Sequence, residues 1–91
     1  MKTLYTVKIF GKVQGVCFRM ETKEKADELG ITGFVQNKPD NSVYIKAEAG
    51  KEKLDEFVKW CRKGPKGARI ESVEIAEELP KEFKEFIIQH E

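Results

Sequence analysis

The chain has 91 residues, of which 40% are hydrophobic and 36% are charged, and its formal net charge at pH 7 is only +1. This length fits one domain over residues 1–91 with a single modest core, and the near-neutral charge argues against nucleic acid as a partner, because nucleic-acid binders usually carry a basic excess. The apolar runs are too short for a transmembrane helix, and no secretory leader opens the chain, so we expect no membrane partner.

The residues that could carry redox, metal or base chemistry are few and far apart. Cys17 and Cys61 lack the paired spacing of a zinc or redox site, and with no export signal we expect free thiols in the cytoplasm. His90, the single histidine, is next to the C-terminus, where we expect a frayed, solvent-exposed tail and neither a metal ligand nor a general base. The excess of Lys and Glu among the charges is typical of thermophile proteins.

Hydrophobic periodicity predicts five strands and two helices. In chain order they are a strand at 5–13, a helix at 18–29, strands at 31–37 and 43–49, a helix between Gly50 and Gly64, and strands around 70–76 and 83–89. Gly30 and the pair Gly64-Pro65 end the helices, and the segment 38–41 is a strong turn signal. In the strand at 43–49, apolar and polar residues alternate, and Glu48 is one of the polar residues that we expect to face outward.

This order of elements predicts the fold class. A β-α-β-β-α-β pattern followed by a short extra C-terminal strand indicates an α+β protein with an antiparallel sheet and both helices on one face, the ferredoxin-like α/β sandwich. Because this architecture hosts many activities, it assigns no function by itself.

The segment Gly11–Arg19, GKVQGVCFR, connects the first strand to the first helix. Its middle is uncharged and flexible at Gly15, and Arg19 lies in the first turn of the helix. Unpaired backbone N–H groups and the helix dipole favour an anion there, and a guanidinium binds phosphate or carboxylate bidentately. We therefore interpret the segment as a phosphate site that uses no metal, although an isolated arginine at a helix start is usually a solvated surface residue.

Other phosphate motifs do not fit this loop. The spacing of Gly11 and Gly15 is wrong for a Walker A loop, and Cys17 is too close to Arg19 for a thiol-phosphate enzyme. The acidic residues are scattered, so no carboxylate cluster for magnesium is apparent. The loop would then work without metal, covalent nucleophile or strong base.

A second segment, Gly33–Val43 with the sequence GFVQNKPDNSV, carries Asn37 at the end of the second strand. In the predicted topology Asn37 lies near the helix that begins at Arg19. A carboxamide there can accept from a water and donate to an oxyanion. Taken alone, an asparagine before a Pro-Asp turn is usually turn chemistry.

Together these two segments closely resemble the signature segments of the acylphosphatase family. The resemblance continues through the length, the order of elements, the run from Gly64-Pro65 to Val73 and the aromatic C-terminal strand at 86–88, so it covers essentially the whole chain. One departure is Asn41, where the family usually has glycine. Asparagine is the next-best residue for a left-handed position, so we expect the turn to persist.

The resemblance implies an enzyme that hydrolyses acyl phosphates, which are carboxyl-phosphate mixed anhydrides, to a carboxylate and inorganic phosphate. Arg19 would bind and neutralise the phosphoryl group, and Asn37 would orient the attacking water. The implied phosphate-binding residues, acting largely through backbone N–H groups, are Gln14, Gly15, Val16, Cys17, Phe18 and Arg19. We expect the Cys17 side chain to be a small apolar filler.

The implied partners are an acyl phosphate substrate and inorganic phosphate as product and inhibitor, with no cofactor and no metal. The acyl part of the substrate and the oligomeric state cannot be read from the sequence, although a monomer is our expectation.

The sequence leaves three alternative functions. The first is an accessory domain for carbamoyl-phosphate chemistry. The second is an RNA-binding domain, for which Tyr5 and Tyr44 form no aromatic cluster, and the third is a metallochaperone, for which Cys17 has no paired cysteine. The end of the chain at Glu91 favours a freestanding hydrolase.

Overall fold

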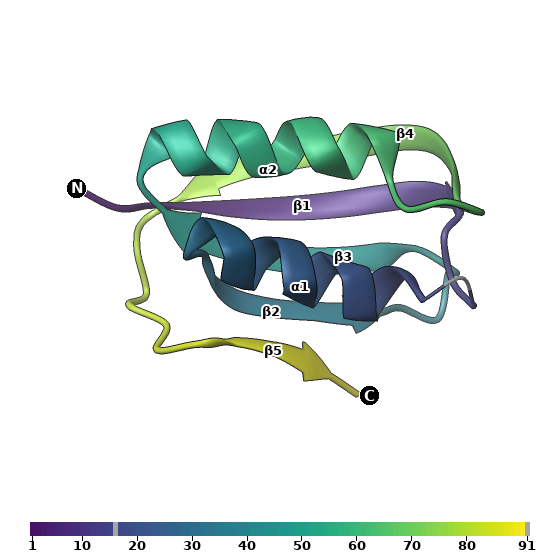
Figure 1. The fold of residues 1–91 in the computed structure, drawn as a ribbon, viewed down its shortest axis with the longest axis horizontal. Helices are drawn as coiled ribbons and strands as arrows, with labels where there is room; N and C mark the ends of the chain where they lie inside the picture. Colours follow the sequence, from purple (N-terminus) through teal and green to yellow (C-terminus); the bar gives the residue numbers. More distant parts are fainter. Residues whose placement is uncertain (16, 91) are drawn as a thin grey trace.

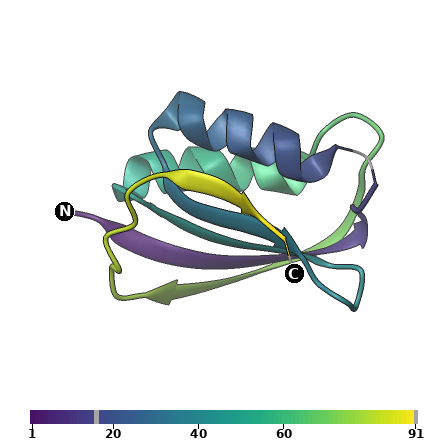
Figure 2. The same cartoon turned by 90° about the horizontal axis from the view of Figure 1, so that it is seen from below.

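The computed structural model describes residues 1–15 and 17–90, which form five strands and two helices. They are β1 (Thr3–Lys12), α1 (Phe18–Leu29), β2 (Thr32–Asn37), β3 (Val43–Ala49), α2 (Lys51–Lys63), β4 (Arg69–Glu78) and β5 (Phe86–Gln89). The strands form one sheet in the order β4-β1-β3-β2-β5, and Figure 2 shows both helices on the same face of it. The predicted ferredoxin-like α+β fold is confirmed. Within the described residues, no helix is long and apolar enough to cross a membrane.

The core lies between the sheet and the two helices. Alternate residues of β1, such as Val7 and Ile9, are fully buried on the helix side, while Lys8 between them is not. The apolar stripe of α2 places Leu54 and Phe57, both fully buried, over the sheet. Each such side chain contributes about 1.5–3 kcal/mol by its burial, so the alternation and the helical stripe together determine which face of each element turns inward.

The fifth strand makes the sheet mixed. The pairs β1–β3, β1–β4 and β2–β3 are antiparallel, as predicted, but β5 pairs with β2 in parallel, with Gly33 opposite Phe86 and Gln36 opposite Gln89. The prediction of an antiparallel sheet is therefore wrong for this strand. Because parallel strands end on the same side, the C-terminal ends of β2 and β5 lie at the edge where α1 begins (Figure 1).

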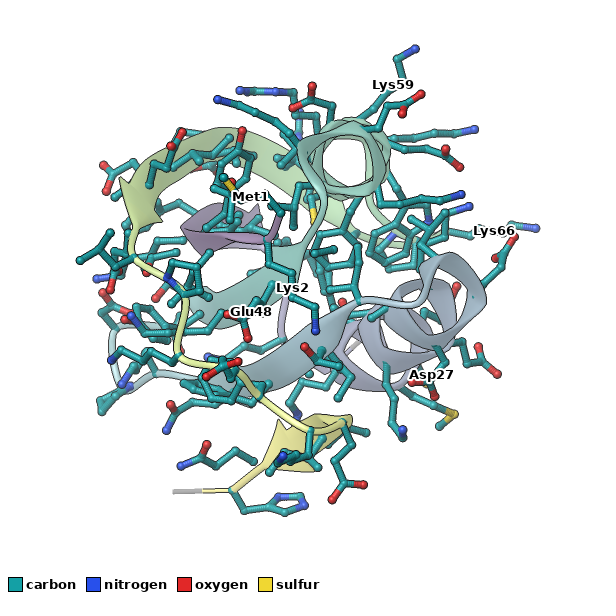
Figure 3. The ribbon with its side chains drawn as sticks, turned by 90° about the vertical axis from the view of Figure 1, so that its left-hand side faces the viewer. Met1, Lys2, Asp27, Glu48, Lys59 and Lys66 are labelled. Carbon is teal, nitrogen blue, oxygen red and sulfur yellow. The ribbon has the colours of Figure 1, made fainter. Side chains whose placement is uncertain are left out.

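The connection from β4 to β5 is held by a buried carboxylate. Glu48 on β3 is fully buried, and its carboxylate accepts hydrogen bonds from the backbone N–H groups of Lys81, Glu82 and Phe83 at 2.7–3.0 Å. Figure 3 shows Glu48 next to this connection. The sequence-based placement of Glu48 among outward polar residues is wrong. Because these N–H groups bond to Glu48, β5 begins at Phe86 and not at the predicted Phe83.

A β-bulge turns the end of β1 toward the loop that follows it. The pairing of β1 with β4 shifts register between Phe10 and Gly11. Gly11 has φ +133°, and a Cβ there would lie 2.0 Å from the carbonyl oxygen of Arg69. Only glycine fits such a close backbone approach, so the first residue of the predicted phosphate segment has a structural role of its own.

Candidate active site

A pocket of about 250 Å³ opens where β1, α1, β2 and β5 meet. Six of the predicted site residues line it, namely Gln14, Gly15, Cys17, Phe18, Arg19 and Asn37. The seventh, Val16, lies outside the described residues. Four further lining residues were not predicted from the sequence, namely Val13, Met20, Ile88 and His90. The two sequence motifs therefore meet at one hollow, and the C-terminal strand forms part of its wall.

The N-terminus of α1 faces this pocket with unpaired backbone donors. The first hydrogen bond of the helix runs from the N–H of Glu21 to the carbonyl of Cys17, at 3.1 Å. The N–H groups of Phe18 and Arg19 precede it, in the first turn, where backbone donors have no partner within the helix. Arg19 is half-buried beside them, so a guanidinium and a helix N-terminus provide positive potential in the same place.

The backbone of the loop adopts two left-handed conformations. Gly15 has φ +76° with open space where a side chain would be, and Cys17, which precedes α1, has φ 59° and ψ 25°. For a residue with a side chain this conformation costs about 1–2 kcal/mol, and such strain tends to persist at functional sites. The prediction that Cys17 is an apolar filler is wrong, because its side chain is exposed.

Phe18 anchors the start of the helix in the core. Its ring is almost fully buried and packs edge-on against Trp60 of α2, with ring centroids 5.9 Å apart. Because the ring is held in the core, the backbone of Phe18 is fixed at the wall of the pocket. Its side chain therefore holds the start of the helix in place.

Gln14 ties the loop to the turn between β2 and β3. Its side-chain Nε2 donates to the carbonyls of Lys38 and Ser42, at 3.0 and 2.9 Å. The turn is formed as predicted, with Asn41 left-handed at φ 72° and its N–H bonded to the carbonyl of Lys38 at 3.0 Å. The Gln14 amide thus serves to hold the two motifs together, a role that the sequence did not indicate.

Asp40 stabilises the same turn. Its carboxylate accepts hydrogen bonds from the hydroxyl and the backbone N–H of Ser42 and is 3.2 Å from the ammonium of Lys8. The Ser42 hydrogen bonds, aided by Lys8, lower the pKa of Asp40 from 3.8 to about 2. At neutral pH the turn that follows Asn37 is therefore held by an ionised carboxylate.

Asn37 presents a buried oxygen to the pocket. Among the residues that the structure describes, its Oδ1 is the buried side-chain oxygen or nitrogen that has no hydrogen-bond partner. Leaving such an atom unpaired costs about 1–3 kcal/mol. An acceptor in this state, at the wall of a pocket, can take a hydrogen bond from a bound water or a ligand.

Arg19 has a neighbour from the far end of the chain. Its Nη1 lies 3.2 Å from Nδ1 of His90. His90 is exposed, as predicted, but the pairing of β5 with β2 also brings it to the wall of the pocket, which was not predicted. The sequence carried no signal for it, since the contact depends on the parallel pairing of β5 with β2.

The other candidate groups are placed as follows. Cys61 lies on the buried face of α2, and burial raises the pKa of its thiol well above the usual range. Cys17 and Cys61 are both free. In the described part of the chain, no three His, Cys, Asp or Glu side chains are grouped to hold a metal ion. The groups that face the pocket are thus a guanidinium, backbone N–H donors, an amide oxygen and an imidazole.

Comparison with known proteins identifies a family. A sequence model described as Acylphosphatase matches residues 5–88. The chain is 42% identical to an acylphosphatase of Methylococcus capsulatus over 97% of this chain and 96% of that protein. It is 47% identical to one of Rubrobacter xylanophilus, over 79% of this chain and 66% of that protein. The crystal structure of acylphosphatase from Bacillus subtilis superposes with a TM-score of 0.93 and 28% identity, over 96% of this chain and 98% of that one.

Proposed function

The chain belongs to the acylphosphatase family of hydrolases, and we propose that its pocket cleaves the carboxyl-phosphate bond of acyl phosphates without a metal ion. The single observation that carries this proposal is the composition of the pocket: the Arg19 guanidinium, the N-terminus of α1 and the unpaired Asn37 oxygen line one hollow. These are the groups needed to hold a phosphoryl dianion and a water beside each other.

In this proposal the backbone N–H groups of residues 14–19 and the guanidinium of Arg19 hold the phosphoryl group. The helix N-terminus and the arginine both favour negative charge. Their attraction grows as charge accumulates on the phosphoryl oxygens and the departing carboxylate, so the pocket stabilises the transition state more than the ground state. Gln14 supports the loop through its side chain, which is bonded to the β2–β3 turn.

Asn37 is proposed to orient the attacking water through Oδ1. The water oxygen forms a bond to phosphorus, the bond from phosphorus to the acyl oxygen breaks, and the carboxylate leaves with the electron pair. We assign the proton of the water to a phosphate oxygen of the substrate itself, because that oxygen lies next to the attacking water. A carboxylate is a good leaving group, so positioning and electrostatic stabilisation can carry most of the catalysis.

The proposal names an acyl phosphate as substrate and inorganic phosphate as product and competitive inhibitor. The two thiols recorded as free are compatible with a reducing compartment such as the cytoplasm. Met20 and Ile88, which complete the pocket wall, are proposed to face the acyl group.

The experiment that tests this function separates Arg19 from Asn37. Arg19 should contact the phosphoryl group before and during the reaction, so Arg19→Gln should weaken inhibition by phosphate and also reduce turnover. Asn37 should act on the water, so Asn37→Ala should spare phosphate inhibition and lower turnover by roughly 10²–10³. Steady-state kinetics with an aromatic acyl phosphate, with and without inorganic phosphate, measures both quantities.

Arg62→Gln is the matched control, because it removes the same charge from an exposed position in the last turn of α2. It should leave turnover and phosphate inhibition unchanged. The proposed division of roles fails if Asn37→Ala keeps near-normal turnover, or if it loses phosphate inhibition as severely as Arg19→Gln does.

A further inference from the structure

Arg19 and His90 lie within hydrogen-bond distance, and the donors that each side chain carries determine the direction of this bond. A guanidinium carries only donors, so at 3.2 Å the Nδ1 of His90 must accept the hydrogen bond from Arg19. In this hydrogen bond Nδ1 carries no proton, so the form of the ring that accepts from Arg19 is the neutral one. An imidazolium in the same place could not accept this bond and would be repelled by Arg19.

Several contacts hold His90 at the pocket. The strand β5 pairs with β2 up to Gln36 and Gln89, immediately before the histidine. The ammonium of Lys23 on α1 donates to the carbonyl of Phe86 at 2.9 Å, and Glu48 holds the connection that leads into the strand. Contacts at both ends of β5 thus hold His90 close to Arg19.

The charged groups around the imidazole are those of the described residues, 1–15 and 17–90. Among the described residues that line the pocket, Arg19, Cys17 and His90 are the ones that titrate or carry a charge. On α1, Lys23 is bonded to Asp27 at 2.9 Å as well as to β5. On the β2–β3 turn, the ammonium of Lys38 lies over the ring of Tyr44, 4.7 Å from its centre. Among the described residues, Arg19 is the charged group in direct contact with His90.

We propose that His90 is a proton-linked ligand for the anion in this pocket, so that the protein binds one proton together with a phosphate-like dianion. The inference rests on the proposed phosphate site. When a dianion draws the Arg19 guanidinium to itself, Nδ1 of His90 loses its donor. Protonation then turns the ring from an acceptor for Arg19 into a second cationic donor for the anion.

The direction of the linkage follows from the charges. Without an anion, a proton on His90 is disfavoured by the positive charge of Arg19; with a dianion present, the same proton is favoured. Anion binding and protonation must therefore strengthen each other. Histidine changes its charge within about pH 5 to 8, so the affinity for an anion should rise as the pH falls through this range, and product phosphate should leave more readily at the alkaline end.

Sulfate is the suitable probe, because it stays a dianion across this range and its own ionisation does not contribute. Calorimetric titration of the protein with sulfate, repeated from about pH 8 to about pH 5.5 in buffers of different ionisation enthalpy, gives the affinity and the number of protons taken up. We expect binding about tenfold tighter at the acid end, which corresponds to one pKa unit of coupling, with net proton uptake.

His90→Asn tests the assignment, because asparagine can accept from Arg19 but does not protonate. It should abolish the tightening in acid and the proton uptake, whereas Gln89→Asn, one residue earlier on the same strand, should keep both. The inference is overturned if wild-type sulfate affinity is flat or weakens toward acid pH, or if His90→Asn keeps the slope. Absence of sulfate binding at every pH would instead overturn the proposed phosphate site.

Discussion

Single residues at the pocket carry costs that the rest of the chain avoids. Cys17 has a left-handed backbone without being glycine, and the buried Oδ1 of Asn37 has no partner among the described residues. Each costs on the order of 1–3 kcal/mol, and both line the same hollow as Arg19. Backbone strain and unpaired buried polar atoms are expected where a protein binds a ligand or carries out a reaction.

The side chain of Cys17 should be dispensable. The left-handed conformation costs alanine about as much free energy as it costs cysteine. Cys17→Ala should therefore fold normally and keep its backbone N–H in the loop. Turnover of an acyl phosphate and inhibition by phosphate should both stay close to those of the wild type. Alkylation of Cys17, in contrast, should slow turnover because the added bulk lies at the pocket wall. A Cys17→Ala variant that folds normally but is inactive would point to a thiol mechanism instead.

The sequence could identify those site residues that belong to a local motif. Arg19 and Asn37 each lie at a fixed place relative to a predicted strand or helix, so their approach to one pocket followed from the topology. His90 and Glu48 had no such signal. His90 reaches Arg19 only through a pairing of distant strands, and Glu48 occupies a position that alternation assigns to solvent.

Among the elements, β5 depends most on contacts outside itself. It has four residues, forms the edge of the sheet and pairs with β2 alone. Lys23 bonds the carbonyl of Phe86 at the start of the strand, and Glu48 bonds the connection that precedes it. The sequence predicted the presence of this strand but extended it to Phe83, since no local pattern shows that buried carboxylate oxygens bind the N–H groups of residues 81–83.

Glu48→Gln should weaken the attachment of β5. A carboxamide has one oxygen and an NH₂ group, so at least one of the three backbone donors would face another donor. We expect the free energy of unfolding, measured by urea denaturation at neutral pH, to fall by about 1–3 kcal/mol. Burial raises the pKa of Glu48, but the hydrogen bonds from Glu82, Phe83 and Lys81 outweigh it and the net pKa is below 4.5. The stabilisation is therefore present above that pH and lost as the pH falls through the lowered pKa.

Glu77→Gln is the matched control, because Glu77 is 57% exposed and pairs only with the exposed Lys51. Its effect on unfolding should stay within about 0.5 kcal/mol. The assigned role of Glu48 is refuted if its variant loses no more stability than this control at neutral pH, or if the difference between the two persists unchanged in acid.

On the scale of the whole molecule, the topology gathers the chemistry at one end of the sheet. The ends of β1, β2 and β5 and the start of α1 all lie there, as Figure 1 shows. The order of elements was readable from periodicity and turn residues because each segment is strongly patterned. The direction of β5 was not readable, since the pattern of a strand of four residues does not show whether it pairs in the parallel or the antiparallel sense.

The central claim, metal-free hydrolysis of an acyl phosphate, is tested most directly by release of inorganic phosphate from benzoyl phosphate in excess chelator. We expect the same turnover with and without the chelator, and poor turnover of phenyl phosphate, because a phenolate leaves less readily than a carboxylate. If the chelator abolishes turnover and magnesium restores it, or if the ester is hydrolysed as fast as the acyl phosphate, the account is contradicted.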